Sequence, residues 1–247
     1  MIVGIDIGTQ SLKASVIDAD LRLRGTAAVS YRPSLPRPGW AEQSPVLWEQ
    51  AIGPAIAAAL RNADARPADV RSLGISGQLD GCIPVGENGT ALAPCIIWMD
   101  RRAQAEITAL PTAQIRACTG IVPDASHMAA KIRWLKRNSD PTGRRGFHQP
   151  VSYMVERLTG ESVIDHALAS TSMLYGLERG DYDDSLLELF EVDRRELPPI
   201  RDASSQAGVL NAKGSELTGL PVGVPVAVGT GDDFAAPLGA GIIRPGT

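Results

Sequence analysis

Segments typical of β-strands alternate with helical patterns along this chain, and this alternation constrains the fold more than any other feature of the sequence. Such a pattern predicts an α/β domain in which helices flank a mixed sheet. The first three strand segments follow one another with only short links, so we expect an antiparallel meander at the start of the sheet. These segments are Met1–Ile7, Leu12–Ile17 and Arg24–Tyr31.

The remaining segments continue the alternation. A helix is predicted from Pro45 to about Asn62, because Ser44 is a favoured N-cap residue and proline is favoured at the first helical position. A hairpin is predicted around the turn at residues 87–89, and residues 139–149 are predicted to form a surface loop. The other expected strands are Val70–Ile75, Cys82–Val85, Ala93–Trp98 and Val224–Val228, and the other expected helices are Arg101–Ala109, Ala129–Asn138, Val151–Leu158, Ser185–Phe190 and Asp232–Ala240.

The composition is that of an ordinary globular protein, with 247 residues of which 44% are hydrophobic and 21% are charged. This length suits one large domain, in which a small helical insertion is expected near residues 100–205. Twenty-four basic and 28 acidic residues leave a net charge of −4. The charge excludes an overall basic surface for nucleic acid and gives no reason to expect a membrane as partner.

Neither a membrane span nor a secretion signal is predicted. The longest apolar helical stretch, Ala51–Leu60, is too short to cross a bilayer, and the N-terminus lacks the basic region of a signal peptide. The three cysteines, Cys82, Cys95 and Cys118, lack the spacing of a zinc site or a disulfide framework. We therefore expect buried, reduced thiols in a cytoplasmic protein.

The first strand segment contains a carboxylate in an unusual setting. Because side chains alternate along a strand, Asp6 shares one face with Gly4 and Gly8. A buried carboxylate is costly unless it is paired or lies near a cation, and the two glycines leave room for a ligand. The turn that follows offers backbone N–H groups, hydroxyls and an ammonium, which together could hold a phosphate. The alternative is a tight turn in which Asp6 bonds to the backbone.

Three further polar clusters follow predicted strands. Ligands of open α/β sheets bind at the carboxyl ends of strands. Asp232 and Asp233 come after a glycine-containing turn, and a single helix cap would need only one of them. Gln78 and Asp80 could bond to several hydroxyls, or could belong to a hairpin turn. Asp100 is expected to cap the helix that follows it.

Several common site types are excluded or disfavoured. The chain has no GxxxxGK[ST] segment, which excludes a Walker-type nucleotide site, and no GxGxxG follows a strand, so a dinucleotide fold has no support. His127, His148 and His166 are scattered without the spacing of metal ligands. Each is predicted to be a surface residue or a polar residue with its hydrogen bonds satisfied.

Taken in order, the polar segments resemble those of the FGGY family of carbohydrate kinases, most closely its xylulokinase-like members. The family pattern runs IGIDxGT, a PGWxEQ-like loop, a GxxGQxxG strand end, a WxDxR junction and a GxGD turn. The resemblance covers nearly the whole chain. The matching segments are Val3–Thr9, Pro38–Gln43, Gly74–Gly81, Trp98–Arg101 and Gly229–Asp232, with further matches at residues 131–135, 158–161 and 217–221.

The resemblance implies an actin/hexokinase-like fold with an RNase H-like core. It also implies ATP-dependent phosphorylation of a sugar hydroxyl, with ATP and Mg²⁺ required. Residues 1–247 would form the N-terminal, sugar-binding domain. The C-terminal nucleotide domain would be absent from this chain, so we expect the chain alone to be inactive.

The resemblance also assigns roles by position. Asp232 matches the general base, and Asp6 matches the carboxylate that helps to hold Mg²⁺, often through water. The sugar contacts would be Gln78, Leu79, Asp80, Asp233 and Trp40, and the phosphate loop would be Gly8, Thr9, Gln10, Ser11 and Lys13.

The chain departs from the xylulokinase-like pattern at the sugar contacts. It has Leu79-Asp80 where those members have Met-His, and Asp233 where they have Asn. Carboxylates only accept hydrogen bonds, but the hydroxyls of a sugar or polyol can donate to them. We therefore expect a small sugar or polyol as partner, first a ketopentose such as xylulose.

Other functions stay open at this point. The alternatives are a kinase of glycerol, erythritol or ribulose, a sugar-binding module without catalysis, and a chaperone-like ATPase of the same superfold. Asp6 and Asp232 argue against the binding module, because a sensor needs neither a metal ligand nor a base. The oligomeric state is also open, with a homodimer as one option.

Overall fold

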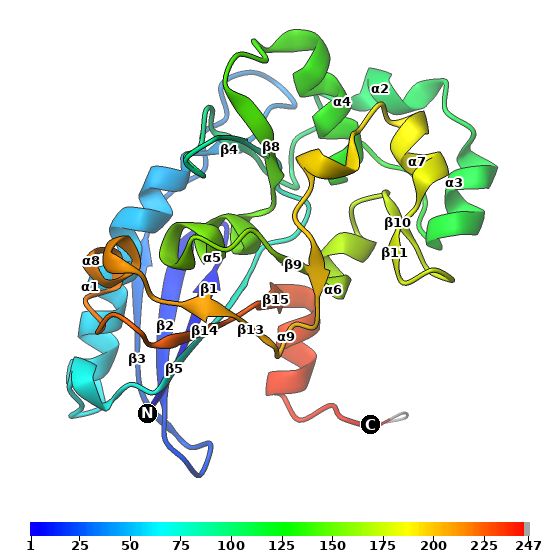
Figure 1. The fold of residues 1–247 in the computed structure, drawn as a ribbon. Coiled ribbons are helices and arrows are strands. Elements are labelled where there is room, and N and C mark those ends of the chain that lie inside the picture. The colour runs from blue at the N-terminus through cyan, green and yellow to red at the C-terminus, as the bar shows by residue number, and fades with distance from the viewer. Residues whose placement is uncertain (245–247) are drawn as a thin grey trace.

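The structure is a computed structural model that describes residues 1–244. Its centre is a mixed sheet with the strand order β13-β14-β5-β1-β2-β3, and β15 pairs with β5 beyond the end of β14 (Figure 1). Strands β1, β2 and β3 form the predicted antiparallel meander, and β5 runs parallel to β1. The strands are β1 Ile2–Ile7, β2 Ser11–Ile17, β3 Leu23–Ser30, β5 Ser72–Gly77, β13 Gln206–Val209, β14 Pro225–Ala227 and β15 Thr230–Gly231.

Helices α1 and α5 pack on one face of this sheet, and α8 packs against both of these helices. Strand β1 turns Val3, Ile5 and Ile7 inward, where they are 0–2% exposed, because apolar and polar residues alternate along it. On its other face, a Cβ added at Gly4, or at Gly74 of β5, would meet no atom within 4 Å. One face of the sheet is therefore core, and the other is open beside Asp6. The covering helices are α1 Pro45–Asn62, α5 Pro150–Thr159 and α8 Ala212–Thr218.

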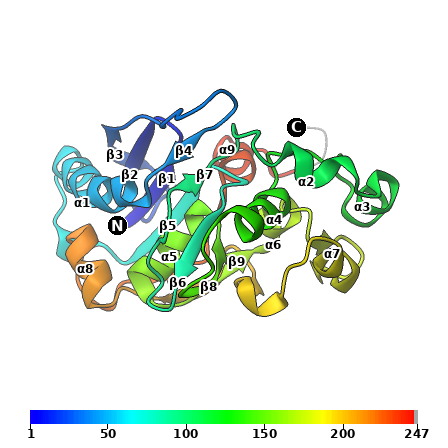
Figure 2. The same ribbon diagram turned by 90° about the horizontal axis from the view of Figure 1, so that it is seen from above.

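Residues 78–205 lie between β5 and β13 in the chain and contribute no strand to the central sheet. Their helices α2, α3, α4 and α7 gather at the end of the molecule away from β2 and β3 (Figures 1 and 2). The elements are β6 Ile83–Gly86, β7 Cys95–Ile96, α2 Gln104–Thr108, α3 Thr112–Thr119, α4 Met128–Asn138, β8 Arg144–His148, β9 Ile164–Asp165, α6 His166–Ser170, β10 Tyr175–Gly176, β11 Asp181–Tyr182, α7 Asp184–Leu189, η2 Arg194–Glu196 and β12 Ile200–Arg201; β4 Glu42–Gln43, η1 Pro67–Asp69 and α9 Asp232–Gly239 lie outside this stretch.

One local prediction is wrong, and another holds in part. Residues 139–149 are not a surface loop, because β8 lies within them and its Phe147 and His148 are buried. Around the turn at residues 87–89 the chain does fold back on itself: antiparallel bridges join Cys82 to Ile96 and Val85 to Ala91, and the Leu92 N–H donates to the Pro84 carbonyl. The hairpin is not a continuous two-stranded ladder, because β6 also pairs with β8, and β7 also pairs with β4. Distant strands therefore add to the local pairing that the turn predicted.

Two further observations bear on the class of protein. No helix in residues 1–244 is long and apolar enough to cross a membrane. All three cysteines are free; Cys82 and Cys95 are buried and Cys118 is partly exposed.

Candidate active site

The carboxyl ends of β1, β5 and β15 meet at one edge of the sheet. Asp6 pairs with Ser76, and Gly231 pairs with Gly77, so the segments that follow these strands converge. They enclose a pocket of about 340 Å³. Its lining residues are Thr9, Gln78, Leu79, Asp80, Trp98, Arg101, Ser126, Asp232 and Asp233.

Asp6 is the last residue but one of β1 and lies on the open face of the sheet. Its Oδ2 lies 3.2 Å from Nζ of Lys13, its partner on the neighbouring strand β2, and its Oδ1 is buried without a hydrogen-bond partner among the described residues. Burial, with the nearby charge of Asp6, raises the pKa of Tyr31. The alternative of a backbone-bonded Asp6 is not seen in residues 1–244. The Asp6 carboxylate therefore has open space beside it and one oxygen that accepts no hydrogen bond from the described residues.

The turn after Asp6 is held from three sides. Tyr31 Oη donates to the Gly8 carbonyl (2.8 Å), Gln43 Nε2 donates to the Thr9 carbonyl (2.7 Å), and Trp98 Nε1 donates to Thr9 Oγ1 (3.1 Å). The Gly8 N–H donates to the Ser11 carbonyl, which closes the turn. Gln10 faces away from the pocket, beside Ser30 and Arg32, and Lys13 is exposed. The turn is therefore rigid, and only Thr9 of its residues lines the pocket.

Asp232 begins α9, and Gly231, not an aspartate, is the N-cap residue. Within the described residues, the only hydrogen bond to the Asp232 carboxylate comes from the Asp233 N–H (3.0 Å). Burial, together with the charges of Asp233 and Asp6, raises the pKa of Asp232. A simple capping role does not account for this pair. Three carboxylates instead lie close together at the ends of neighbouring strands.

The turn before α9 depends on glycine and on a distant aspartate. Gly229 has φ +79, and a Cβ there would lie 2.2 Å from the Ile75 carbonyl oxygen, so no other residue fits. Thr230 Oγ1 donates to Asp165 Oδ2 (2.7 Å), and the same carboxylate caps α6. Asp165 is a positioning residue that the sequence did not reveal.

Gln78 is oriented by a chain of amide hydrogen bonds. Its Nε2 donates to Oε1 of Gln43 (2.6 Å), whose Nε2 in turn donates to the Thr9 carbonyl. The Gln78 Oε1 is consequently left as a buried acceptor with no partner among the described residues. Leu79 beside it packs so close to Gly231 that a Cβ there would lie 2.8 Å from its methyl group.

Asp80 has a left-handed backbone, with φ +58. Its N–H donates to Oε1 of Gln149 (3.0 Å), its carbonyl accepts from Nζ of Lys131 (2.5 Å), and its Oδ2 lies 3.1 Å from Nδ1 of His127. Its Oδ1 is buried and has no partner in residues 1–244. His127 is therefore neither a surface residue nor remote from the site.

Two sequence predictions need correction. Trp40 does not line the pocket; it packs edge-on against Trp134 at 5.4 Å and under the Arg102 guanidinium at 3.6 Å. Asp100 does not cap a helix, since α2 begins after Ala103. The buried Asp100 carboxylate instead accepts from the Ala41 N–H (2.6 Å) and pairs with Arg102 (2.7 Å). Both residues hold the loop that carries Gln43.

The pocket also contains residues that the sequence analysis missed. Trp98 and Arg101 stand in the WxDxR junction, so the motif itself was a signal for them. Ser126, which lines the pocket, and His127, which contacts Asp80 but does not line the pocket, precede α4 and had no such signal. Within residues 1–244, no group of three or more His, Cys, Asp or Glu side chains is arranged to hold a metal ion alone.

Comparisons with known proteins agree with this arrangement. The model of the FGGY family of carbohydrate kinases, N-terminal domain, matches residues 1–239. The chain belongs to this family. The fold class predicted from the sequence is thereby confirmed, since solved FGGY kinases superpose closely on the structure.

The relatives act on more than one compound. A glycerol kinase of Thermococcus kodakarensis is 30% identical over 99% of this chain and 50% of its own length, and a xylulose kinase of Escherichia coli is 29% identical over 98% and 50%. The solved xylulose kinase of Rhodospirillum rubrum is 30% identical with a TM-score of 0.90, over 99% of this chain and 51% of its own. The chain thus spans about half the length of the relatives it matches.

Proposed function

We propose that this FGGY chain is the sugar- or polyol-binding half of an ATP-dependent kinase. The observation that carries the proposal is the pocket at the carboxyl ends of β1, β5 and β15, which holds Asp232 close to Asp6. ATP is the phosphate donor, and its adenosine is bound mostly outside this chain. A binding module without catalysis would need neither a base nor a metal-holding carboxylate, whereas this chain has both Asp232 and Asp6.

Asp232 acts as the general base. Its raised pKa makes its carboxylate a better proton acceptor while it remains open to the pocket. The substrate hydroxyl attacks the γ-phosphorus of ATP, the bond from that phosphorus to the bridging oxygen of ADP breaks, and the hydroxyl proton passes to Asp232. Phosphoryl transfer depends mainly on positioning and charge neutralisation, and the Thr9 turn and the Lys13 ammonium supply both to the phosphates.

Mg²⁺ fits at Asp6. The buried Oδ1 lacks a protein partner, and the neighbouring carboxylates make the site attractive to a cation. Mg²⁺ in such enzymes is held by one or two carboxylates together with substrate phosphates and water. A three-residue cage is therefore not required of this chain. Asp6 would hold the ion, which would neutralise phosphate charge when bound.

The substrate is a neutral compound with several hydroxyls. Asp80, Asp232 and Asp233 supply carboxylates to the pocket wall, and Gln78, whose NH₂ group is used by Gln43, has an amide oxygen with no partner among the described residues. These groups accept hydrogen bonds and would repel an anion. A ketopentose such as xylulose is the first candidate, and glycerol is the second because glycerol kinases are among the relatives.

Calorimetry on the 247-residue chain tests the proposal. Xylulose, ribulose, glycerol and erythritol are titrated in turn, followed by a deoxy analogue of the best ligand. We expect one of the four to bind and the deoxy analogue to bind about tenfold more weakly or worse, since a missing hydroxyl leaves a buried acceptor unpaired. Failure of all four to bind would overturn the proposed substrate class.

The chain alone should bind its substrate but transfer little or no phosphate. It spans half the length of its relatives, and most of the adenosine site is expected outside it. A coupled assay for ADP with the purified chain, ATP and Mg²⁺ measures this. Robust turnover would show that residues 1–247 contain a complete nucleotide site.

A further inference from the structure

Asp80 is held in place more tightly than any other carboxylate of the pocket. Its N–H, its carbonyl and one carboxylate oxygen each have a partner, and these partners come from two helices outside the central sheet. Gln149 is the N-cap residue of α5, His127 is the N-cap residue of α4, and Lys131 lies one turn into α4. Lys131 and Gln149 are fully buried.

This arrangement stabilises the left-handed backbone conformation of Asp80. A positive φ is uncommon for a residue other than glycine, and Asp80 adopts it with the backbone bonds to Gln149 and Lys131 in place. The backbone bonds fix where the side chain starts. The contact with His127 then fixes which carboxylate oxygen is used by the protein, and Oδ1 is left without a partner among the described residues.

We propose that His127 is a positioning residue for substrate recognition. By binding Oδ2 of Asp80, it leaves Oδ1 as the acceptor for a hydroxyl of the substrate. The inference rests on the proposed function, because it takes the pocket to be the sugar or polyol site. It adds a histidine that does not itself line the pocket.

The contact is also sensitive to pH. Burial disfavours the imidazolium, but the hydrogen bond and charge of Asp80, with the charge of Asp124, outweigh burial and raise the pKa of His127. The other charged groups facing it are Lys131, which opposes the shift, and Arg101, which is paired with Asp124. The protonated ring makes a charge-assisted hydrogen bond to Asp80. The extra strength that the charge gives to this bond is lost as the pH rises through the pKa of His127.

Two variants of His127 separate a positioning role from a merely structural one. His127→Ala removes the hydrogen bond. His127→Asn keeps it, because an asparagine amide can take the place of Nδ1, but it cannot be protonated. His166→Ala is the matched control, since His166 is half-exposed, bonds to Tyr175 and lies outside the pocket. Xylulose and glycerol binding to the 247-residue chain is measured by calorimetry at about pH 6 and about pH 9, on either side of the ordinary and raised histidine range.

We expect His127→Ala to bind the probe about tenfold more weakly or worse at the lower pH, and His127→Asn to stay within about threefold of the wild type. Wild-type affinity should fall as the pH rises, and His127→Asn should lose this slope while sharing every other titrating group. The inference is overturned if His127→Ala binds the probe as tightly as the wild type does, or if the affinity of His127→Asn depends on pH as steeply as that of the wild type. If the alanine variant does not fold, the slope in the asparagine variant decides. Binding of neither probe to the wild type would instead refute the proposed function.

Discussion

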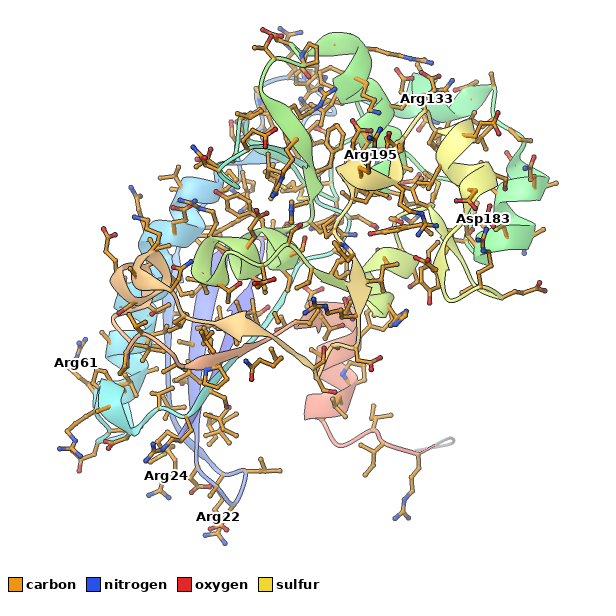
Figure 3. The ribbon with its side chains drawn as sticks, viewed as in Figure 1. Arg22, Arg24, Arg61, Arg133, Asp183 and Arg195 are labelled. Carbon is orange, nitrogen blue, oxygen red and sulfur yellow. The ribbon has the colours of Figure 1, made fainter. Side chains whose placement is uncertain are left out.

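Two cavities of this molecule differ in size and in how their polar atoms are satisfied. The larger, of about 790 Å³, lies beside η2 and β12 and includes Arg145, Arg194 and Arg195, the last labelled in Figure 3. Each of these arginines already has a carboxylate partner. The partners are Glu156 at 2.7 Å, Asp181 at 2.8 Å and Asp193 at 2.6 Å.

The smaller cavity, at the ends of the central strands, is the reverse case. Its wall contains Asp80 and Gln78, each with a buried oxygen that lacks a partner in the described part of the chain, and Asp6 beside it has a third. Buried polar atoms without partners are rare and costly. Judged by volume and charge, the larger cavity would be the candidate binding site. The unpaired hydrogen-bond acceptors instead identify the smaller cavity as the candidate site.

The largest expected effect comes from the base. Asp232→Asn keeps the size of the side chain and an oxygen that can accept from the Asp233 N–H, but it cannot take a proton. We expect kcat to fall by about 10²–10⁴ in a kinase that joins this chain to a nucleotide-binding half, with substrate Kd nearly unchanged. If Asp232 served only to accept the Asp233 N–H at the start of α9, asparagine would serve about equally well.

Asp233→Asn is the control for this change, and it should alter substrate Kd more than kcat. Thermal melting of both variants excludes misfolding. A well-folded Asp232→Asn enzyme with kcat within a few-fold of wild type would remove Asp232 from the mechanism.

The next largest effect is expected at Glu156, the partner of Arg145 in the larger cavity, and it is an effect on stability alone. Burial opposes the charge of Glu156, but the hydrogen bonds from His148 and Arg145 lower its pKa from 4.5 to about 2. Because the folded pKa is depressed, Glu156 stabilises the fold above its unfolded pKa, and this contribution is lost as the pH falls from about 4.5 to about 2. Glu156→Gln should therefore lower the free energy of unfolding at pH 7 by up to about 3 kcal/mol.

Denaturant titrations of both proteins between pH 7 and pH 2 measure that difference, which should shrink toward the acid end. Substrate affinity should not change, because Glu156 does not line the smaller pocket. A weakened substrate affinity in a folded Glu156→Gln chain would link the two cavities and break the contrast between them.

A smaller effect is expected at the sugar contact. Asp80→Asn removes the carboxylate charge but keeps the shape, so substrate affinity should fall by about 10- to 100-fold, the range for a charge-assisted hydrogen bond. ATP hydrolysis without substrate, measured in the joined kinase, should stay the same. Unchanged KM for every accepted sugar would mean that Asp80 does not face the substrate.

Local pattern predicted the parts of the fold that local physics controls. The alternation of apolar residues in β1 and the Ser44-Pro45 start of α1 both led to the observed elements. The Ser44 side chain makes no cap bond, so proline and the apolar face of the helix were the better signals. Strand β8 was missed because its partner β6 lies some 60 residues away, and no turn joins them.

The site divides in the same way. Asp6 lies near the carboxyl end of β1, and Gln78, Asp80 and Asp232 follow strands, so the pattern of strand ends predicted where they would meet. His127 reaches Asp80 across 47 residues of chain, and this contact depends on how α4 packs. Trp40 illustrates the opposite error: a motif predicts that an aromatic residue is needed, but packing decides whether it faces a ligand or another indole ring.

The smallest effect is predicted for the most exposed charge of the larger cavity. The Arg195 side chain is 89% exposed, and its partner Asp193 lies two residues away in the chain. In exposed ion pairs of this kind, solvent screening and the cost in side-chain entropy cancel most of the free energy gained from the attraction between the charges. Arg195→Ala should leave the melting temperature nearly unchanged and substrate affinity within about twofold of wild type. The variant opens the larger cavity without touching the smaller one. A clear loss of substrate or ATP binding would therefore mean that the larger cavity takes part in function, although its charges are paired. In that case, unpaired polar atoms alone would not identify the functional site.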